Sequence, residues 1–351
     1  MEKVFEGGEP MVSMKDIAKE CGVSVAAVSK ALSGQPDISE ATRERIKKAA
    51  EDMGYQPNSA AKVLRTHKSN NIGILFVDEA HNGLTNEFFA LLLDRFKHVA
   101  DSKGYDITFI NRGLSSNVGN MNYLAHARYR AFDGVLIACM DFHDAEVIEL
   151  AQSNIPIVSI DYCFDNRMSV VSDNVNGMRE LVIHCAKMGH KKIAYIHDGN
   201  DSDVTRDRVA SFKETMAGLG LSVPDEYLPV AEYRKTERAR IATEKLLNLP
   251  DRPTCILYPD DFSALGGIAA IKEAGLEIPK DISIVGYDGI RVGRHLTPSL
   301  TTLRQPTELI GETAAQKLIS LIEHPLETRV EKVVIKGRLY DGGSVRDLRY
   351  D

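Results

Sequence analysis

The stretch VSMKDIAKECGVSVAAVSKALSG, residues 12–34, contains two short helical segments joined by a tight turn. Ser13 is a good N-cap for the first segment, Gly22 begins the turn, and Ser24 caps the second segment, roughly residues 25–32. This spacing predicts a helix-turn-helix, in which the second helix can enter the major groove of DNA. The alternative is a helical bundle with an accidental glycine turn.

The residues after this motif complete a small helical head. A polar loop leads to Ser39, which caps a third predicted helix that ends near Met53, with Gly54 as its C-terminal stop. Residues 59–64 suit one further helix, too short to be stable alone in water, and a polar linker follows. Apolar residues at helical spacing supply a small core: Ile17, Ala18, Val23, Val28, Leu32, Ile46, Ala49 and Ala50.

From about residue 71 the pattern changes to short apolar runs that alternate with amphipathic segments. Strands buried on both faces are continuously apolar, so this order predicts parallel sheets with right-handed crossovers, and the length of the region favours two sheets. The apolar runs are 72–77, 107–110, 135–138, 155–160, 170–172, 193–196, 255–258 and 282–285. The clearest helical segments are 87–103, 177–188, 204–219, 235–247 and 262–274.

The predicted fold class is therefore an all-α headpiece plus an α/β core of two doubly wound, parallel-sheet subdomains. The change of subdomain is expected near residues 165–169, and residues 300–305 are expected to cross back. The expected parts are a tail at 1–10, a headpiece at 11–57, a hinge helix and linker at 58–70, a first core subdomain at about 71–168 and 302–328, and a second at about 169–301 and 329–351.

Charge is distributed unevenly along the chain of 351 residues, whose formal net charge is −7. Residues 11–68 contain ten Lys and Arg against seven Asp and Glu, whereas residues 69–351 carry a net charge of −8. A mildly basic head on an acidic body permits DNA binding by the head and disfavours it by the body.

The composition argues against several classes of protein. The five cysteines form no CxxC pair, so we expect neither a disulfide framework nor a zinc site, and a reducing cytoplasm is the expected location. No apolar stretch reaches the length of a membrane helix, and residues 1–10 lack the apolar run of a signal peptide. The sequence also has no GxSxG motif and no P-loop. We therefore expect no enzyme activity, metal or cofactor.

The first ten residues raise a separate question. Glu6-Gly7-Gly8-Glu9 can be encoded by a purine run that resembles a ribosome-binding site, at about the usual spacing before Met11. We therefore expect translation to begin at Met11. A genuine N-terminal tail is the alternative.

Ordered motifs resemble the LacI/GalR family of bacterial repressors over almost the whole chain. In the head the resemblance rests on residues 12–34, 39–46 and 54–61. It implies a periplasmic-binding-protein-like core, operator DNA binding as a homodimer, and control by a small-molecule effector. In the core it rests on FFA at 88–90, FDGV at 132–135, GHKKIA at 189–194, GYD at 286–288 and LTT at 300–302, with Asp261, Ala264 and Gly266.

The resemblance implies a set of DNA contacts in the head. Val25, Ala26 and Lys30 would lie on the groove face of the recognition helix. The two apolar side chains can touch thymine methyl groups, and the lysine can donate to guanine or phosphate. For each residue the alternative is plain helix surface. The candidates for phosphate contacts that set the register are Ser24, Ser29, Arg43 and Asn58.

The resemblance places Ala61 and Leu64 on a hinge helix whose leucine wedges into the minor groove and bends the DNA. The residues agree with this role, because an apolar Leu64 beside Lys62, Arg65 and Lys68 suits a wedge flanked by phosphate-binding cations. A short exposed linker describes the unbound protein and does not compete with this interpretation.

A ligand pocket is expected between the core subdomains, at the carboxyl ends of the strands. Asp161 and Asp288 end predicted strands, and Arg208 lies on a predicted helix. Carboxylates and a guanidinium bridge neighbouring hydroxyls, and an aromatic face packs against a sugar ring, so a carbohydrate is the expected effector. For a lone strand-end aspartate, a helix cap is the alternative. The positions that match the family's effector site are Phe88, Phe89, Asp161, Arg208, Asp260 and Asp288.

Two positions depart from the family's pattern. Asp260 stands where members often carry Asn or Ser, and Gly289 stands where Asp is common. The more acidic pocket favours a neutral sugar over a nucleobase or a phosphorylated ligand, and it leaves an amine-bearing ligand open. Control by a protein or another non-sugar corepressor is a further alternative.

Two other classes of protein fit less well. A transport-type sugar-binding protein predicts an export signal and no DNA-binding head, and a nucleotide-dependent enzyme predicts a glycine-rich phosphate loop. Neither set of features is found in the sequence. The sequence therefore favours a cytoplasmic, ligand-responsive transcriptional regulator.

Overall fold

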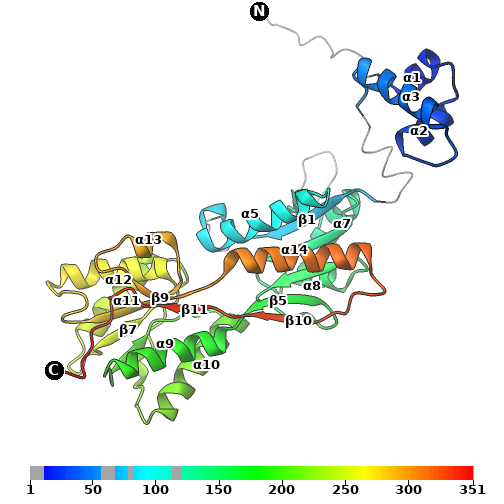
Figure 1. The fold of residues 1–351 in the computed structure, drawn as a ribbon. Helices are drawn as coiled ribbons and strands as arrows, with labels where there is room; N and C mark the ends of the chain where they lie inside the picture. The colour runs from blue at the N-terminus through cyan, green and yellow to red at the C-terminus, as the bar shows by residue number, and fades with distance from the viewer. Residues whose placement is uncertain (1–11, 57–67, 78–82, 113–120, 351) are drawn as a thin grey trace, which may run out of the picture. The chain divides into compact units, whose positions relative to one another are not determined.

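The computed structural model describes residues 12–56, 68–77, 83–112 and 121–350 (Figure 1). They belong to two compact units, one up to Ser69 and one from Asn70 onwards. The expected tail at 1–10 lies outside the described residues, as does most of the expected hinge segment.

The first unit is a three-helix headpiece of α1 (Met14–Glu20), α2 (Val25–Leu32) and α3 (Glu40–Asp52). The turn between α1 and α2 requires Gly22, whose φ of 62° lies in the left-handed region that favours glycine. The Ser24 hydroxyl accepts a hydrogen bond from the Ala27 amide at 3.1 Å and so caps α2, as expected. The three helices enclose a core of Ile17, Ala18, Val28, Ala31, Ile46 and Ala50.

The first half of the core unit is built on a six-stranded, fully parallel sheet in the order β10-β5-β4-β3-β1-β2. Alternate side chains of the central strands point to opposite faces, where α5 and α14 cover one face and α7 and α8 cover the other. The strands are β1 (Asn71–Phe76), β2 (Asp106–Phe109), β3 (Gly134–Ala138), β4 (Ile157–Ile160), β5 (Met168–Ser172) and β10 (Lys332–Ile335). The helices are α5 (Glu87–Ser102), α7 (Tyr123–Tyr129), α8 (Ala145–Gln152) and α14 (Thr307–Glu323), with a 3-10 turn at Gly83–Thr85.

The second half is built on a five-stranded sheet in the order β11-β9-β8-β7-β6, parallel except that β11 runs antiparallel to β9. Helices α9 and α10 pack on one face, and α11 and α12 pack on the other. The strands are β6 (Ile193–Tyr195), β7 (Cys255–Leu257), β8 (Ser283–Asp288), β9 (Thr301–Arg304) and β11 (Arg338–Tyr340). The helices are α9 (Asn174–Lys187), α10 (Asp203–Gly218), α11 (Thr236–Leu247), α12 (Asp261–Glu273) and α13 (Arg291–Arg294), with a 3-10 turn at Asp225–Tyr227.

The structure corrects the expected subdomain boundaries. Residues 168–172 form β5, which pairs with β4 and with β10, so β5 and residues 332–335 belong to the first subdomain and not to the second. Residues 301–304 form β9 in the second sheet, so the expected crossing at 300–305 is also wrong for most of that range. The physical reason is strand pairing. Each of these apolar runs forms backbone hydrogen bonds with neighbouring strands of its own sheet, so the chain crosses to the other subdomain only after the strand has ended.

The two subdomains are joined by three chain crossings, which follow β5, β9 and β10 (Figure 1). The first and third crossings are hydrogen-bonded, because the Asp173 amide donates to the Ile335 carbonyl at 2.9 Å. The second and third are packed together, since a Cβ placed on Gly337 would lie 2.9 Å from a Leu303 methyl carbon and 3.1 Å from the Arg304 carbonyl oxygen. The three crossings therefore form one layered hinge.

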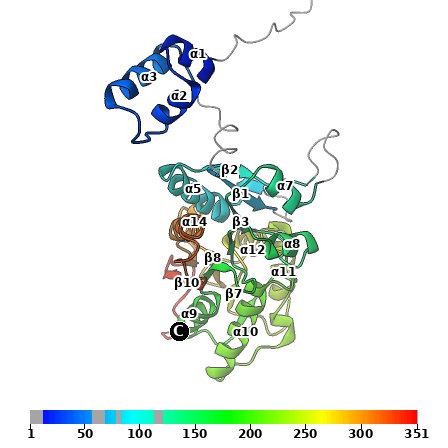
Figure 2. The ribbon, with the colours of Figure 1, turned by 90° about the vertical axis from the view of Figure 1, so that its right-hand side faces the viewer.

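Helices α5 and α14 lie side by side on the first sheet (Figures 1 and 2). Their close approach depends on Gly311, because a Cβ at this position would lie 2.2 Å from the Leu92 carbonyl oxygen and 3.2 Å from the Phe96 amide nitrogen. Both atoms belong to the backbone of α5 and cannot move aside without shifting that helix.

We expect Gly311→Ala to lower the free energy of unfolding of the core by about 1–3 kcal/mol, because overpacking outweighs the gain in helix propensity. Gly218→Ala is the matched control, since a Cβ on Gly218, the last residue of α10, meets no atom within 4 Å. That variant should leave stability unchanged or raise it by about 0.5 kcal/mol. Urea titration followed by circular dichroism measures both, and equal stability of the two variants would contradict the packing argument.

His190 fastens the C-terminal segment to the second subdomain. Its side chain is 2% exposed, with Nδ1 lying 2.9 Å from the Thr254 hydroxyl and Nε2 lying 3.1 Å from the Arg346 carbonyl oxygen. Burial lowers the pKa of this imidazole to about 4. The ring is therefore neutral in the folded protein at neutral pH.

Because the folded pKa lies below the unfolded value of about 6.5, the unfolded chain binds a proton more readily between these values. The contribution of His190 to the free energy of unfolding is therefore fully present near pH 7. It falls by about 3 kcal/mol as the pH drops from about 6.5 to about 4. His190→Gln should flatten this part of the profile. Exposed His98 provides the control, and H98Q should keep the wild-type slope in urea titrations at stepped pH.

Candidate functional site

The outer face of α2 carries the residues predicted to read DNA. Val25 is 41% exposed, and Ala26 and Lys30 are also exposed, whereas Val28 on the same helix is fully buried against α1 and α3. The structure thus places the three predicted groove residues on the surface of the headpiece. Lys30 forms an ion pair with Asp37 in the following loop, so its ammonium group is also held by the headpiece.

The residues predicted to contact phosphate lie in different surroundings. Ser24 is exposed at the N-terminus of α2 and acts as its cap, and Ser29 is half-buried. Arg43 turns back onto its own headpiece, where Nη1 donates to Glu40 at 2.8 Å and Nη2 donates to the Gln35 carbonyl at 2.9 Å. Asn58, Ala61 and Leu64 lie outside the described residues.

The second candidate site is where the carboxyl ends of the strands of both core sheets meet. Phe76 ends β1, Ile160 ends β4 and Asp288 ends β8, and loops that follow these strands carry the polar side chains. This is the place where open α/β sheets bind ligands.

Arg208 on α10 is the central cation of this region. It is 4% exposed, its Nε donates to the Asn174 side-chain oxygen at 2.9 Å, and its Nη1 donates to the Pro259 carbonyl at 3.0 Å. The guanidinium carbon lies 3.5 Å from the centroid of the Tyr287 ring, in a cation–π contact. Three elements, namely α9, the loop after β7 and strand β8, therefore hold the arginine in one orientation.

Asp288 provides a carboxylate beside this cation. Its Oδ1 accepts a hydrogen bond from the Gln305 side-chain amide at 2.8 Å, and its backbone φ is 100°, a conformation rare for a residue other than glycine. Burial raises the pKa of Asp288 to about 6, although Arg208 favours its ionised form. Asp288 therefore titrates within the physiological range.

Asp161 supplies a second carboxylate, from the first subdomain. It follows β4 with a positive φ of 55°, and its carboxylate accepts hydrogen bonds from the Ser172 amide at 2.6 Å and from the Ser172 hydroxyl at 3.4 Å. Burial raises its pKa, and the charge of Arg208 acts in the opposite direction. Asp161 thus lies within electrostatic reach of the arginine on the other subdomain.

Aromatic side chains lie at the first subdomain's side of the cleft. Phe89 packs edge-to-face against Phe76 and Phe88, with centroids 5.4 and 5.0 Å apart. Phe88 is 7% exposed, so most of its surface belongs to the core, and Phe89 is only partly buried. Of the two predicted residues, Phe89 offers more ring surface to a ligand.

Asp260 has a structural role that the sequence left as an alternative. Its carboxylate caps α12 by accepting from the Ser263 amide and hydroxyl, both at 2.8 Å, and it accepts from the Arg234 amide at 2.9 Å. These three hydrogen bonds occupy much of the hydrogen-bond-accepting capacity of the Asp260 carboxylate. Asp260 therefore fixes the loop that carries Arg234.

Sequence analysis missed Arg234. Its Nη1 donates to Asn86 at 3.1 Å, and its Nη2 lies 3.4 Å from the Thr85 carbonyl, so the side chain reaches from the second subdomain to the N-terminus of α5. Arg291 makes a similar contact with Glu87, at 3.3 Å. No local signal predicts these pairs, because Arg234 and Asn86 are 148 residues apart.

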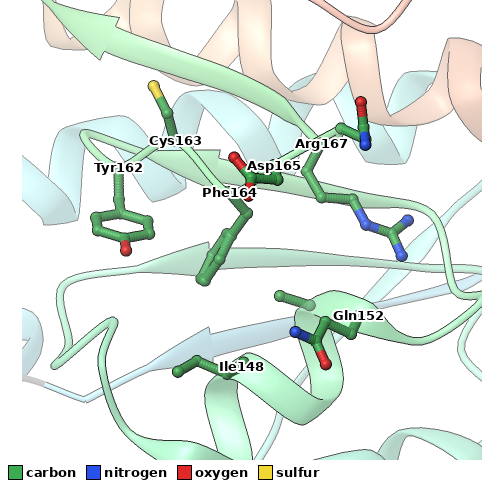
Figure 3. Close-up of a pocket in the computed structure, with 9 residues that line it drawn as sticks. Ile148, Gln152, Tyr162, Cys163, Phe164, Asp165 and Arg167 are labelled. Atoms are coloured by element: carbon green, nitrogen blue, oxygen red, sulfur yellow. The ribbon is translucent and has the colours of Figure 1, made fainter.

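A further cavity, of about 460 Å³, lies between α8 and the 162–167 connection (Figure 3). In Figure 3 the rings of Tyr162 and Phe164 point toward α8, whereas the Cys163 side chain points the opposite way. Tyr162 stacks on Phe142 with centroids 4.5 Å apart. This aromatic cluster begins one residue after Asp161, and sequence analysis did not identify it.

In the described part of the chain, no three His, Cys, Asp or Glu side chains are grouped so that they could hold a metal ion. The five cysteines are all free. Among the helices of the described residues, none is both long and apolar enough to cross a membrane.

Comparisons with known proteins agree with both halves of the molecule. Residues 13–58 match the family model for bacterial regulatory proteins of the lacI family, and residues 182–345 match a periplasmic binding protein-like domain. The "Probable HTH-type transcriptional repressor ExuR" of Bacillus subtilis (strain 168) is 33% identical over 341 residues, which cover 96% of this chain and 99% of the relative. The HTH-type transcriptional repressor PurR of Erwinia tasmaniensis is 29% identical and covers 97% of this chain and 100% of its own.

Solved structures share the fold. The lac repressor dimer bound to operator and the anti-inducer ONPF superposes with a TM-score of 0.82 at 24% identity, over 96% of this chain and 100% of that one. A LacI family transcriptional regulator from Enterococcus faecium with bound ribose gives a TM-score of 0.68 at 26% identity, over 80% of this chain and 100% of that one.

A helix-turn-helix headpiece followed by a two-subdomain binding core defines a DNA-binding transcriptional regulator with an effector-binding domain. The chain belongs to the LacI family of bacterial regulatory proteins, and its curated relatives are transcriptional repressors. The predicted family and fold class are confirmed.

The cap on the recognition helix can be tested in the full chain. Ser24→Ala removes the acceptor for the Ala27 amide, which costs about 1 kcal/mol, and amides of residues 25–32 should exchange with solvent about fivefold faster. Ser24→Asp keeps a capping oxygen and should preserve the wild-type exchange rates. Equal exchange in the wild type and the alanine variant would show that the cap contributes nothing.

Proposed function

We propose that this protein is a cytoplasmic repressor that binds a pseudo-palindromic operator as a homodimer and responds to a small neutral sugar bound between its core subdomains. It acts as a regulator and not as an enzyme. Two-fold symmetry of the protein matches two-fold symmetry of the operator, and α2 of each headpiece enters a major groove.

The observation that carries the sugar proposal is that the buried Arg208 acts electrostatically on the partly exposed Asp288 at the carboxyl ends of the strands, while the first subdomain offers the partly exposed ring of Phe89. A guanidinium and a carboxylate that share one wall of a cleft can bridge neighbouring hydroxyls of a pyranose or furanose, and an aromatic ring can pack on its apolar face. The ribose bound to the Enterococcus faecium regulator, which shares this fold, supports the same chemistry. A protein corepressor would not need a guanidinium buried in the interior of the second subdomain.

The operator is tested by selecting bound duplexes from random DNA at physiological salt. We expect an enriched pseudo-palindrome with a deformable central CG step, since Leu64 is proposed to wedge at the centre. Leu64→Ala should reduce specific binding while the core stays folded. If no sequence is enriched, and candidate ligands do not change that result, the proposed operator binding is wrong.

The effector is tested by screening neutral sugars for a shift in thermal stability, because a ligand that binds only the folded state raises the melting temperature. Arg208→Lys and Asp288→Asn should each weaken the binding of an active sugar at least tenfold, about 1.4 kcal/mol or more. Asp207→Asn is the matched control, since Asp207 is the exposed neighbour of Arg208 on α10. Sugars that bind all four proteins equally would place the effector elsewhere.

Sugar affinity should also depend on pH. The pKa of Asp288 is raised to about 6, so its carboxylate accepts hydroxyl hydrogen bonds above that pH and loses this capacity as it protonates below it. Affinity should fall about tenfold between pH 7 and pH 5. Asp288→Asn, which does not titrate, should show weaker binding without this dependence, and calorimetry at the two pH values measures both.

A further inference from the structure

A second groove, of about 680 Å³, lies on the hinge and is lined with cations. The lining side chains include five basic residues, contributed by α13, by the end of β9 and by the third crossing with the start of β11: Arg291, Arg294, Arg304, Lys336 and Arg338. Acidic lining residues are fewer, namely Glu87, Asp288 and Glu308. The groove is therefore positive, although the core as a whole is acidic.

The strand register forces two of these cations together. Arg304 on β9 is the direct partner of Arg338 on the antiparallel strand β11. Directly opposed residues of an antiparallel pair have Cβ atoms about 4.5–5.5 Å apart, and like charges at such positions destabilise the sheet. Both side chains are exposed, so water screens part of this repulsion. An anion bound between the two arginines would remove the remaining repulsion.

The protein itself supplies no counterion for most of these cations. Glu87 pairs with Arg291 at 3.3 Å. Across the ranges that the structure describes, no carboxylate lies within 4.0 Å of the charged nitrogens of the other four, which are Arg294, Arg304, Lys336 and Arg338. Asp288 also lines the groove, but among the described residues it makes no ion pair with these four cations, and its carboxylate accepts a hydrogen bond from Gln305.

The first turn of α14 adds hydrogen-bond donors to the same groove. Thr307, Glu308 and Leu309 line it, and the N-cap position holds Pro306, which makes no side-chain capping bond. Backbone amides at a helix N-terminus bind anions, aided by the helix dipole. Glu308 offsets part of this potential, so the arginines remain the main attraction.

We propose that this groove is a second ligand site, which binds a small anionic metabolite through its phosphate or carboxylate group. Its volume falls within the range of small-molecule sites. Arginine pairs with phosphate and carboxylate through two parallel hydrogen bonds, which suits the opposed Arg304 and Arg338. The groove adjoins the proposed sugar cleft and shares Phe88 and Asp288 with it, but its cations are the five basic residues named above and not the buried Arg208.

An anion at this site would touch the hinge directly. Arg304 ends the strand before the second crossing, and Lys336 lies in the third crossing. A ligand that neutralises these side chains favours whichever hinge angle brings them closest. The second site thus offers a way for an anionic metabolite to adjust the response to the proposed sugar.

The test is calorimetric titration of the full chain with inorganic phosphate and, separately, with citrate, in chloride buffer of constant ionic strength and without sugar or DNA. We expect saturable binding of at least one probe, and the tighter of the two identifies phosphate or carboxylate as the recognised group. The double substitution Arg304→Gln and Arg338→Gln should raise the dissociation constant at least tenfold, while circular dichroism confirms the fold.

Two control variants make the test specific. Arg128→Gln removes one exposed cation from α7, on the other face of the first sheet, and should leave anion affinity within twofold of the wild type. Asp161→Asn alters the sugar cleft without touching the groove and should do the same. The proposal is overturned if wild type binds neither probe saturably, if the double variant binds as tightly as wild type, or if Arg128→Gln loses affinity equally. Because no sugar is present, these outcomes do not depend on the proposed effector.

Discussion

The burial of the Arg208 charge is the constraint on which the candidate effector site depends. Removing a guanidinium from water costs several kcal/mol unless hydrogen bonds and nearby charges replace its hydration. Here the Asn174 side chain, the Pro259 carbonyl and the Tyr287 ring replace it, and they come from the start of α9, the loop after β7 and strand β8. Satisfying one cation therefore fixes the relative positions of three elements of the second subdomain.

The same cation explains why carboxylates are tolerated around it. Desolvation raises the pKa of both Asp288 and Asp161. The charge of Arg208 opposes this rise at both residues, together with hydrogen bonds from Ser172 at Asp161. Each also has a positive φ, a conformation that costs about 1 kcal/mol or more outside glycine. Strain at these two candidate effector residues is retained because hydrogen bonds from Gln305 and Ser172 hold their side chains in place.

Periodicity predicted the local structure well but could not predict pairing across the chain. The capping serines, Gly22 and the apolar runs specify helices and strands within a few residues, because those signals act over one or two turns. Where the chain changes sheet is decided by partners far away, as in the pairing of β5 with β10, so the predicted boundaries were wrong.

In the candidate site, too, the sequence predicted individual residues but not the contacts between distant parts of the chain. Arg208 and Asp288 were predicted by resemblance, and in the structure the charge of Arg208 favours the ionised form of the Asp288 carboxyl. Asp260, predicted on the same basis, instead holds the cap of α12 and the Arg234 backbone, because its position before a helix favours a local hydrogen bond. The reach of Arg234 to Asn86 joins two subdomains and has no local signature. The predicted DNA contacts on α2 are exposed, and they remain predictions.

Gln305 shows how an event in the cleft can reach the hinge. It is the first residue after β9, its amide donates to the Asp288 carbonyl at 3.0 Å, and its side chain donates to the Asp288 carboxylate at 2.8 Å. A ligand that takes hydrogen bonds to this carboxylate competes with the contact that fixes the start of the second crossing. Because the three crossings are hydrogen-bonded and packed together, they cannot bend independently. We therefore expect a local change at Asp288 to act on all three crossings together, as a rotation of one subdomain against the other would require.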